Sequence, residues 1–189
     1  ETPLCYDSRG PLPPADARFE EDGTIDLRLG LLGRDPAGWR SSHATGVIDF
    51  AAEAVHDPLD FFEPVHAKDG RCVLEPGSFY IFASKERISI PPWLVAEMLP
   101  VDVGIGELRN NYAGFFDSGF GWNAGGDHGT PAVLEVRARD VPFLVEDGQV
   151  FFRLRFSRTA GEPARIYGQG REASSYRGQD LTLGRMFRS

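Results

Sequence analysis

Glycine and proline divide this chain into short segments, and this division constrains the fold more than any other feature. The 189 residues include 22 glycines and 14 prolines, about a fifth of the total. Both residue types interrupt regular secondary structure and favour turns. Between them, short stretches alternate apolar and polar side chains, as half-buried strands do. The sequence therefore predicts an all-β protein, a distorted β-barrel or sandwich with many short strands.

The clearest alternation covers residues 24–29, 78–83, 131–139 and 149–156, and shorter apolar stretches at 46–50, 72–74 and 87–90 also predict strands. Residues 92–98 predict the one short helix, because a proline in the first helical turn loses no hydrogen bond. Residues 1–23 are rich in proline and acidic residues and are interpreted as a lead-in or linker. Residues 24–160 then form the barrel domain, and residues 161–189 form a basic carboxyl-terminal tail.

Composition and motifs exclude several classes of function. No window approaches 18 consecutive apolar residues, so neither a transmembrane helix nor a membrane partner is expected. Two cysteines, Cys5 and Cys72, are too few for a disulfide framework or a thiolate zinc site, which favours a reducing, cytoplasmic location. The four histidines are scattered, so no metal site is predicted. A P-loop, a G-x-S-x-G elbow and the zinc-deaminase signature are absent.

Charge is distributed unevenly along the chain. Residues 150–189 contain eight arginines and three acidic residues, a net charge of +5, so residues 1–149 carry −13 of an overall charge of −8. The basic tail either meets a negatively charged ligand or pairs with the acidic body, and the sequence leaves both readings open. A nucleic-acid polymer is not expected as a partner, because the whole chain is acidic and has only two lysines.

Two segments contain candidate functional residues. In the strand at 132–138, Glu135 shares a face with Val133 and Arg137. This face is either an ordinary solvated surface or a surface covered by a neighbouring subunit, where the carboxylate would act as a general base. The second segment spans residues 106–121. Its Gly114 allows close backbone approach to a flat ligand, and its Phe115 offers a stacking face. An ordinary turn cluster is the alternative.

Several motifs, in this order, resemble those of the dCTP deaminase / dUTPase superfamily. They are I-D-L-R-L-G at 25–30, L-E-P-G-S-F at 74–79, A-G-F-F-D-S-G-F at 113–120, V-L-E at 133–135, V-E-D-G-Q at 145–149, Tyr167, and S-Y-R-G-Q at 175–179. The resemblance covers about residues 24–180 and is strongest to the carboxyl-terminal half of tandem-domain bacterial dCTP deaminases. It implies a β-clip (dUTPase-like) barrel in a homo-oligomer, or in a pseudo-trimer with a sister domain, with sites at subunit boundaries.

The resemblance also implies zinc-independent hydrolysis of dCTP to dUTP and ammonia, so deoxycytidine and deoxyuridine nucleotides are the expected ligands. No cofactor is tightly bound, and Mg²⁺ enters only with the triphosphate. Glu135 corresponds to the proton shuttle, and the predicted catalytic region also includes Asp117, Glu107 and Arg109. The residues expected at the nucleotide are Ala113, Gly114, Phe115, Tyr167, Arg171, Tyr176, Arg177 and Gln179.

One loop departs from the family pattern. The R-S-S-x-G-R loop of the family falls on D-V-G-I-G-E at residues 102–107, so its serines and second arginine are missing and Glu107 stands in place of that arginine. Three hypotheses stay open. The chain is a deaminase whose missing elements come from another domain or subunit, a non-catalytic assembly half, or a dUTP pyrophosphatase in which Asp117 orients a water.

Overall fold

Strands make up almost all of the regular structure in the computed structural model, which describes residues 4–7, 10–12, 23–43, 46–101, 108–110, 114–122, 129–169, 180–181 and 183–188. They are β1 (Cys5–Asp7), β2 (Gly10–Pro11), β3 (Thr24–Arg28), β4 (Gly38–Ser41), β5 (Phe62–Val65), β6 (Arg71–Leu74), β7 (Phe79–Ile88), β8 (Leu94–Pro100), β9 (Leu108–Asn110), β10 (Phe115–Phe116), β11 (Thr130–Ala138), β12 (Phe143–Glu146) and β13 (Val150–Arg158). The one helix of the described residues is a single 3-10 turn, η1 (Pro58–Asp60). The all-β prediction is confirmed.

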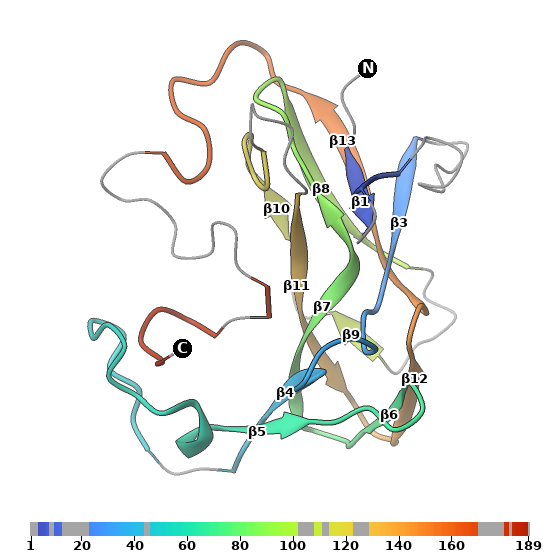
Figure 1. The fold of residues 1–189 in the computed structure, drawn as a ribbon, viewed down its shortest axis with the longest axis vertical. Coiled ribbons are helices and arrows are strands. Elements are labelled where there is room, and N and C mark those ends of the chain that lie inside the picture. Colours follow the sequence, from blue (N-terminus) through green and yellow to red (C-terminus); the bar gives the residue numbers. More distant parts are fainter. Residues whose placement is uncertain are drawn as a thin grey trace.

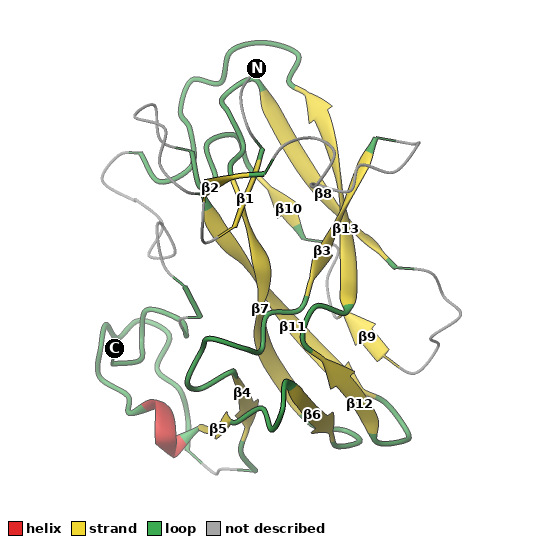
Figure 2. Ribbon diagram, turned by 45° about the vertical axis from the view of Figure 1, so that its right-hand side comes forward, coloured by secondary structure: helices red, strands yellow, loops and turns green. Residues whose placement is uncertain are grey.

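The strands form a curled, barrel-like arrangement of antiparallel sheets (Figure 1). The larger sheet has the order β2-β1-β7-β11-β9, and β4 also pairs with β7 and carries β5. A second sheet has the order β10-β8-β13-β3, and β6 pairs with β12 in a two-stranded ribbon. Figure 2 shows β7 and β11 running side by side along the length of the molecule. This pair is the support on which the candidate site is built.

Alternation along β11 separates a core face from an outer face, as the sequence predicts. Ala132, Leu134, Val136 and Ala138 are buried in the core, whereas Val133, Glu135 and Arg137 point outward. The core also contains Leu27 of β3, Phe82 of β7 and Leu154 of β13, all fully buried. Because β11 is fixed by core side chains at every second residue, the position of Glu135 on the opposite face is fixed as well.

Three local predictions are wrong. The sequence indicates a loop over residues 33–42, but residues 38–41 form β4, which pairs with β5 and β7. Residues 92–98 were expected to form a helix, but residues 94–100 form β8, which pairs with seven residues of β13 along its whole length. Burial alternates along this strand, so sheet pairing outweighs the helix propensity of its leucine, alanine and glutamate residues. Residues 46–50 were expected to form a strand, but they form a loop with exposed Val47 and Phe50. No neighbouring strand offers this segment hydrogen bonds within the described part of the chain.

The two ends of the chain are attached to the barrel. Within the predicted lead-in, β1 pairs with the end of β7, opposite Ile88 and Arg87. At the other end, the Phe187 ring packs among His56, Phe61 and Phe62, with ring centroids 5.5–6.1 Å away. The backbone of this end is also held, since the Val55 amide donates to Met186 O (3.0 Å). The carboxyl-terminal residues therefore lie against the segment that contains η1 (Figure 1).

Candidate active site

Glu135 lies on the outer face of β11, at the mouth of a cavity of about 290 Å³. The lining residues come from three strands and the residue before β10: Met98, Gly114, Phe115, Phe116, Val133, Leu134 and Glu135. Apart from Glu135, all of these side chains are apolar. The structure thus brings together three predicted site residues, Gly114, Phe115 and Glu135, which are up to 21 positions apart in sequence. A single carboxylate in an apolar hollow is suited to proton transfer with a flat, uncharged ring.

Short hydrogen bonds fix the segment opposite Glu135. The Met98 amide donates to Gly114 O (2.7 Å), and β10 pairs with β8 so that Phe115 faces Glu97. The Ser118 hydroxyl donates to Leu94 O (2.7 Å). A Cβ atom on Gly114 would lie 3.2 Å from the Met98 methyl carbon, so the backbone here packs tightly against the cavity wall. Phe115 remains 61% exposed, and its ring is available to a ligand at the cavity mouth.

A second, smaller cavity of about 160 Å³ lies beside the first. The two cavities share Phe116 and Val133, and the second is also lined by Phe120, Thr130, Pro131, Tyr167 and Asp180. We call these two neighbouring cavities, which between them are lined by Glu135, Tyr167 and Asp180, the Glu135 groove. Tyr167 is held at its far end, because its amide donates to Ser118 O (2.7 Å) and its ring lies 5.3 Å from the Phe120 ring.

The other predicted site residues divide into two groups. Asp117 is exposed and lies on the turn after β10, but its side chain lines neither cavity of the groove. Arg109 lies opposite Arg137 in the pairing of β9 with β11. This pairing fixes the position of the Arg109 backbone but not that of its side chain. The remaining residues lie outside the described residues: Glu107, Ala113, Arg171, Tyr176, Arg177 and Gln179.

Sequence reasoning missed several lining residues, among them Met98 and Asp180. Met98 was assigned to the expected helix at 92–98, so its contact with the segment at 114–116 was not foreseen. Asp180 directly follows the S-Y-R-G-Q motif and resembled an ordinary acidic tail residue. Its position in the groove depends on a contact with the barrel that no local pattern predicts.

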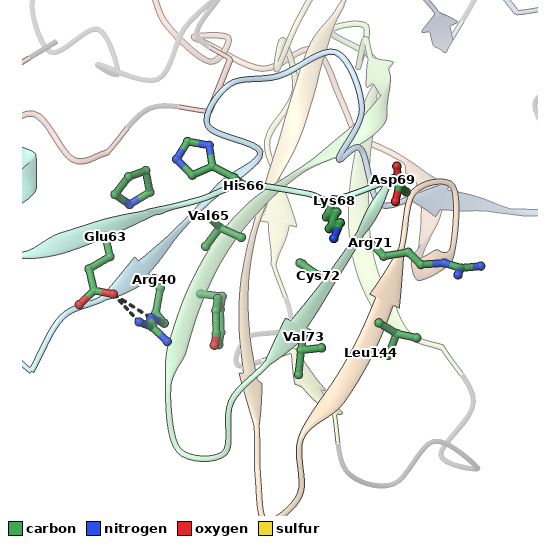
Figure 3. A pocket seen from close by; sticks show the side chains of 12 residues that line it. Arg40, Glu63, Val65, His66, Lys68, Asp69, Arg71, Cys72, Val73 and Leu144 are labelled. Atoms are coloured by element: carbon green, nitrogen blue, oxygen red, sulfur yellow. Dashed lines mark hydrogen bonds and ion pairs between the residues drawn. The ribbon is translucent and has the colours of Figure 1, made fainter.

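A larger cavity, of about 540 Å³, lies between β5 and β6, away from Glu135 (Figure 3). Two of its arginines already engage carboxylates. Arg40 binds both Glu63 and Glu75, and Arg71 binds Glu146 (2.7 Å). Burial raises the pKa of Cys72, which also lines this cavity, to about 11, so its thiol is a poor nucleophile at neutral pH.

Two further classes of site were sought among the described residues. In that part of the chain, no three His, Cys, Asp or Glu side chains are grouped so that they could hold a metal ion. None of its helices has the length and apolar character that crossing a membrane requires.

Comparison with known proteins identifies the family. Residues 14–187 match the family model described as "2'-deoxycytidine 5'-triphosphate deaminase (DCD), C-terminal domain". The chain belongs to this family. The match includes both the strand of Glu135 and the Phe115 segment, and it confirms the resemblance seen in the sequence motifs.

Relatives of the chain carry consistent names. It is 29% identical over 171 residues to proteins named "dCTP deaminase, dUMP-forming" from Beutenbergia cavernae and Mycolicibacterium gilvum, covering 89% of this chain and 81% and 82% of theirs. The crystal structure of 2'-deoxycytidine 5'-triphosphate deaminase from Agrobacterium tumefaciens superposes with a TM-score of 0.67 at 43% identity, over 74% of this chain. The chain spans 43% of that protein's length. The fold is thus the dUTPase-like barrel that the sequence predicts.

Proposed function

We propose that this chain takes part in the hydrolytic deamination of dCTP to dUTP, with Glu135 as the acid–base group. The observation that carries the proposal is the position of Glu135 at the mouth of an apolar cavity, beside the exposed Phe115 ring and the backbone of Gly114. The size of this cavity and its single carboxylate suit a pyrimidine ring. Membership of the deaminase family and the names of the relatives support the same reaction class.

The reaction needs one group that accepts and then donates a proton. Water adds to C4 of the cytosine ring as its proton passes to the Glu135 carboxylate. The carboxylate passes that proton to N3, whose double bond to C4 becomes a single bond. It then takes the proton of the new C4 hydroxyl and gives it to the 4-amino group, so that the C4–N bond breaks, ammonia leaves and C4 keeps the oxygen as a carbonyl. The carboxylate is regenerated, so dCTP and water yield dUTP and ammonia. A single carboxylate can perform these steps because it alternates between its charged and its protonated form.

The open side of the Glu135 groove would be covered by a second subunit or by a sister domain. Phe115 and Val133 are exposed apolar residues that flank Glu135 and would be buried in such a contact. The covering chain would also supply the serine and arginine that D-V-G-I-G-E at residues 102–107 lacks. The proposal therefore includes a homo-oligomer, or a pseudo-trimer with a sister domain.

The triphosphate would lie toward the Tyr167 end of the groove. The segment after Tyr167 contains Arg171, Arg177 and Gln179, whose side chains donate hydrogen bonds suited to phosphate oxygens. Asp117, which directly follows β10, would accept a hydrogen bond from the sugar. Mg²⁺ would enter with the phosphates rather than bind the chain by itself.

A second candidate is a reaction that continues to dUMP. Both curated relatives are named dUMP-forming, which favours a second step in which water attacks the α-phosphate and pyrophosphate leaves. Asp117 would orient that water. An exposed aspartate two residues after Phe115 is close enough in sequence to serve both the sugar and the adjacent phosphate.

The test is to incubate the protein with dCTP and Mg²⁺ and to follow ammonia, dUTP, dUMP and pyrophosphate together. Ammonia with dUTP supports the first candidate, and ammonia with dUMP and pyrophosphate supports the second. No ammonia from the chain alone, with release restored when the sister domain is added, identifies a shared site. No ammonia in either case refutes both candidates and favours a non-catalytic assembly role.

A further inference from the structure

Strand β7 contains a bulge opposite the strand that carries Glu135. The register of the β7–β11 pairing shifts between Pro131 and Val133, so that Ala132 alone lies opposite three residues of β7, 84–86. A bulge bends a strand pair and increases its twist, and Figure 1 shows β7 curving beside β11. Three residues against one leaves two extra residues, an even number. The core and outer faces therefore continue through the bulge, and Glu135 keeps its outward position.

The Ser84 hydroxyl closes this bulge. Its Oγ donates to Glu86 O (2.6 Å) and accepts a hydrogen bond from the Ala132 amide (2.8 Å). Ser84 is completely buried, so water cannot take the place of the hydroxyl. Because buried backbone groups need hydrogen-bond partners, this one side chain compensates for the interruption of the ladder on both strands.

The bulge is held on its other side by the segment at the end of β3. Arg34 Nη2 donates to Ser84 O (3.1 Å), and the Arg28 amide donates to the Glu86 carboxylate (2.8 Å). The Arg28 guanidinium also forms an ion pair with this carboxylate. Residues 84 and 86 are thus fixed from the side of β3, and the Ser84 hydroxyl connects this fixed position to Ala132 in β11.

Ala132 lies between the parts of β11 that line the two cavities of the Glu135 groove. Residues 133–135 line the first cavity, and Thr130 and Pro131 line the second together with Val133. The bend at Ala132 therefore sets the position of the Glu135 carboxylate relative to the wall of the second cavity. A ligand that contacts both cavities meets the carboxylate correctly only when this bend is correct.

We propose that Ser84 is a positioning residue for Glu135. Its hydroxyl fixes the bend of β11 and so the distance between the Glu135 carboxylate and the reacting ring carbon. Ser84 lines neither cavity, so it acts through β11 and takes no part in proton transfer. This inference rests on the proposed function, since it assumes that dCTP reacts at Glu135.

Ser84→Ala and Ser84→Thr test the proposal in the assembly that converts dCTP, with kcat and KM measured for ammonia release. Ser84→Ala is expected to lower kcat roughly 10–100-fold with KM within about threefold, because a small misplacement of a catalytic group mainly affects the chemical step. Exchange of the Ala132 amide hydrogen should become at least about tenfold faster relative to the other β11 amides, because its acceptor is lost. Ser84→Thr keeps a hydroxyl and should restore both the protection of this amide and kcat.

Two further variants separate positioning from general stability. Ser89→Ala also removes a buried hydroxyl, which shares a side-chain hydrogen bond with Tyr6, but Ser89 lines neither cavity. This control should lower the melting temperature and leave kcat within about twofold of wild type. If Ser84→Ala does not fold, Ser84→Cys carries the test, because the thiol has a similar size but is a weaker donor and acceptor. Its kcat should be at least about threefold below that of wild type.

The outcomes distinguish this inference from the proposed function. The role of Ser84 would be overturned by a normal kcat in folded Ser84→Ala, or in Ser84→Cys where that variant carries the test. It would also be overturned by a Ser84→Thr protein that regains the protection of the Ala132 amide but not kcat, or by an equal loss of kcat in Ser89→Ala. In each of these cases the wild-type assembly still deaminates dCTP. A wild-type assembly that releases no ammonia would refute the proposed function and this inference with it.

Discussion

Asp147 is the group whose removal tests the electrostatic account of the barrel most clearly. Its carboxylate accepts hydrogen bonds from the Leu31 amide (2.9 Å) and the Leu32 amide (3.0 Å), and it forms an ion pair with Lys85. It thus links the loop after β3, strand β7 and the turn before β13. Its side chain is only 10% exposed. We predict that Asp147→Asn destabilises the fold without changing its structure.

The magnitude follows from these three contacts. An asparagine oxygen still accepts from Leu31 and Leu32, but each bond loses its charge assistance, about 1 kcal/mol apiece. The Lys85 ion pair adds about 0.2–1 kcal/mol, a low value because the lysine side chain is 45% exposed. The expected loss is therefore about 2–3 kcal/mol at pH 7. For a chain of this length it corresponds to a fall in melting temperature of roughly 5–10 °C.

The effect should depend on pH with a definite sign. Burial alone would raise the pKa of Asp147, but the Leu32 amide, the Lys85 ammonium and the Leu31 amide together hold it below its ordinary value of 3.8. A carboxylate with a lowered folded pKa adds stability that is complete above its unfolded value and is lost as pH falls through the folded value. The difference between wild type and Asp147→Asn should thus be full at pH 7 and shrink below about pH 4.

Urea denaturation of both proteins across pH 3–7 measures this difference. Asp140→Asn is the matched control. Asp140 is exposed and its carboxylate lies as far as 4.0 Å from its partner Arg139, so the change should alter stability by less than about 0.5 kcal/mol. A loss below about 0.5 kcal/mol for Asp147→Asn at pH 7, or a difference that grows as pH falls, would refute the account.

Three further substitutions test the core, the backbone and the site. Leu134→Ala should cost about 2–5 kcal/mol in urea denaturation, because the side chain is fully buried in the core, and a cost under about 1 kcal/mol would contradict that packing. Gly121→Ala should destabilise the fold by at least about 2 kcal/mol, because a Cβ atom would lie 2.1 Å from Ile88 O. In the control Gly148→Ala the new Cβ atom meets no atom within 4 Å, so this change should cost only about 1 kcal/mol. Equal costs for the two variants would be evidence against the predicted clash. Phe115→Ala should raise the KM for dCTP several-fold, by loss of base stacking, and an unchanged KM would remove Phe115 from the site.

Sequence alone predicted the strands that carry core side chains on one face. The alternation in β3, β11 and β13 is local information, because burial of every second residue is written directly in the order of apolar and polar side chains. The sequence did not predict β8, because Leu94–Met98 contains good helix formers and its strand form depends on pairing with β13. Similarly, β4 lies in a segment that reads as loop, and it is a strand because β7 and β5 pair with it.

The candidate site was predictable to the extent that its residues lie in motifs. Glu135, Gly114 and Phe115 were each singled out in the sequence, and the fold brings them to one cavity because β10 pairs with β8 beside β11. Asp180 was not singled out, because its contact with the barrel is an ion pair with Arg34, 146 residues earlier in the chain. Contacts between residues so far apart have no periodic signal and are seen only in the folded structure.

The role of Glu135 is tested most directly by comparing Glu135→Gln with Glu146→Gln in the assembly that converts dCTP. Glu146 is an outward-facing strand glutamate that pairs with Arg71, away from the groove. Glutamine keeps the size of the side chain but cannot exchange a proton. We predict that Glu135→Gln lowers kcat for ammonia release by roughly 10²–10⁴-fold while dCTP still binds, and that Glu146→Gln behaves as wild type. A kcat for Glu135→Gln within about twofold of wild type would contradict the assignment.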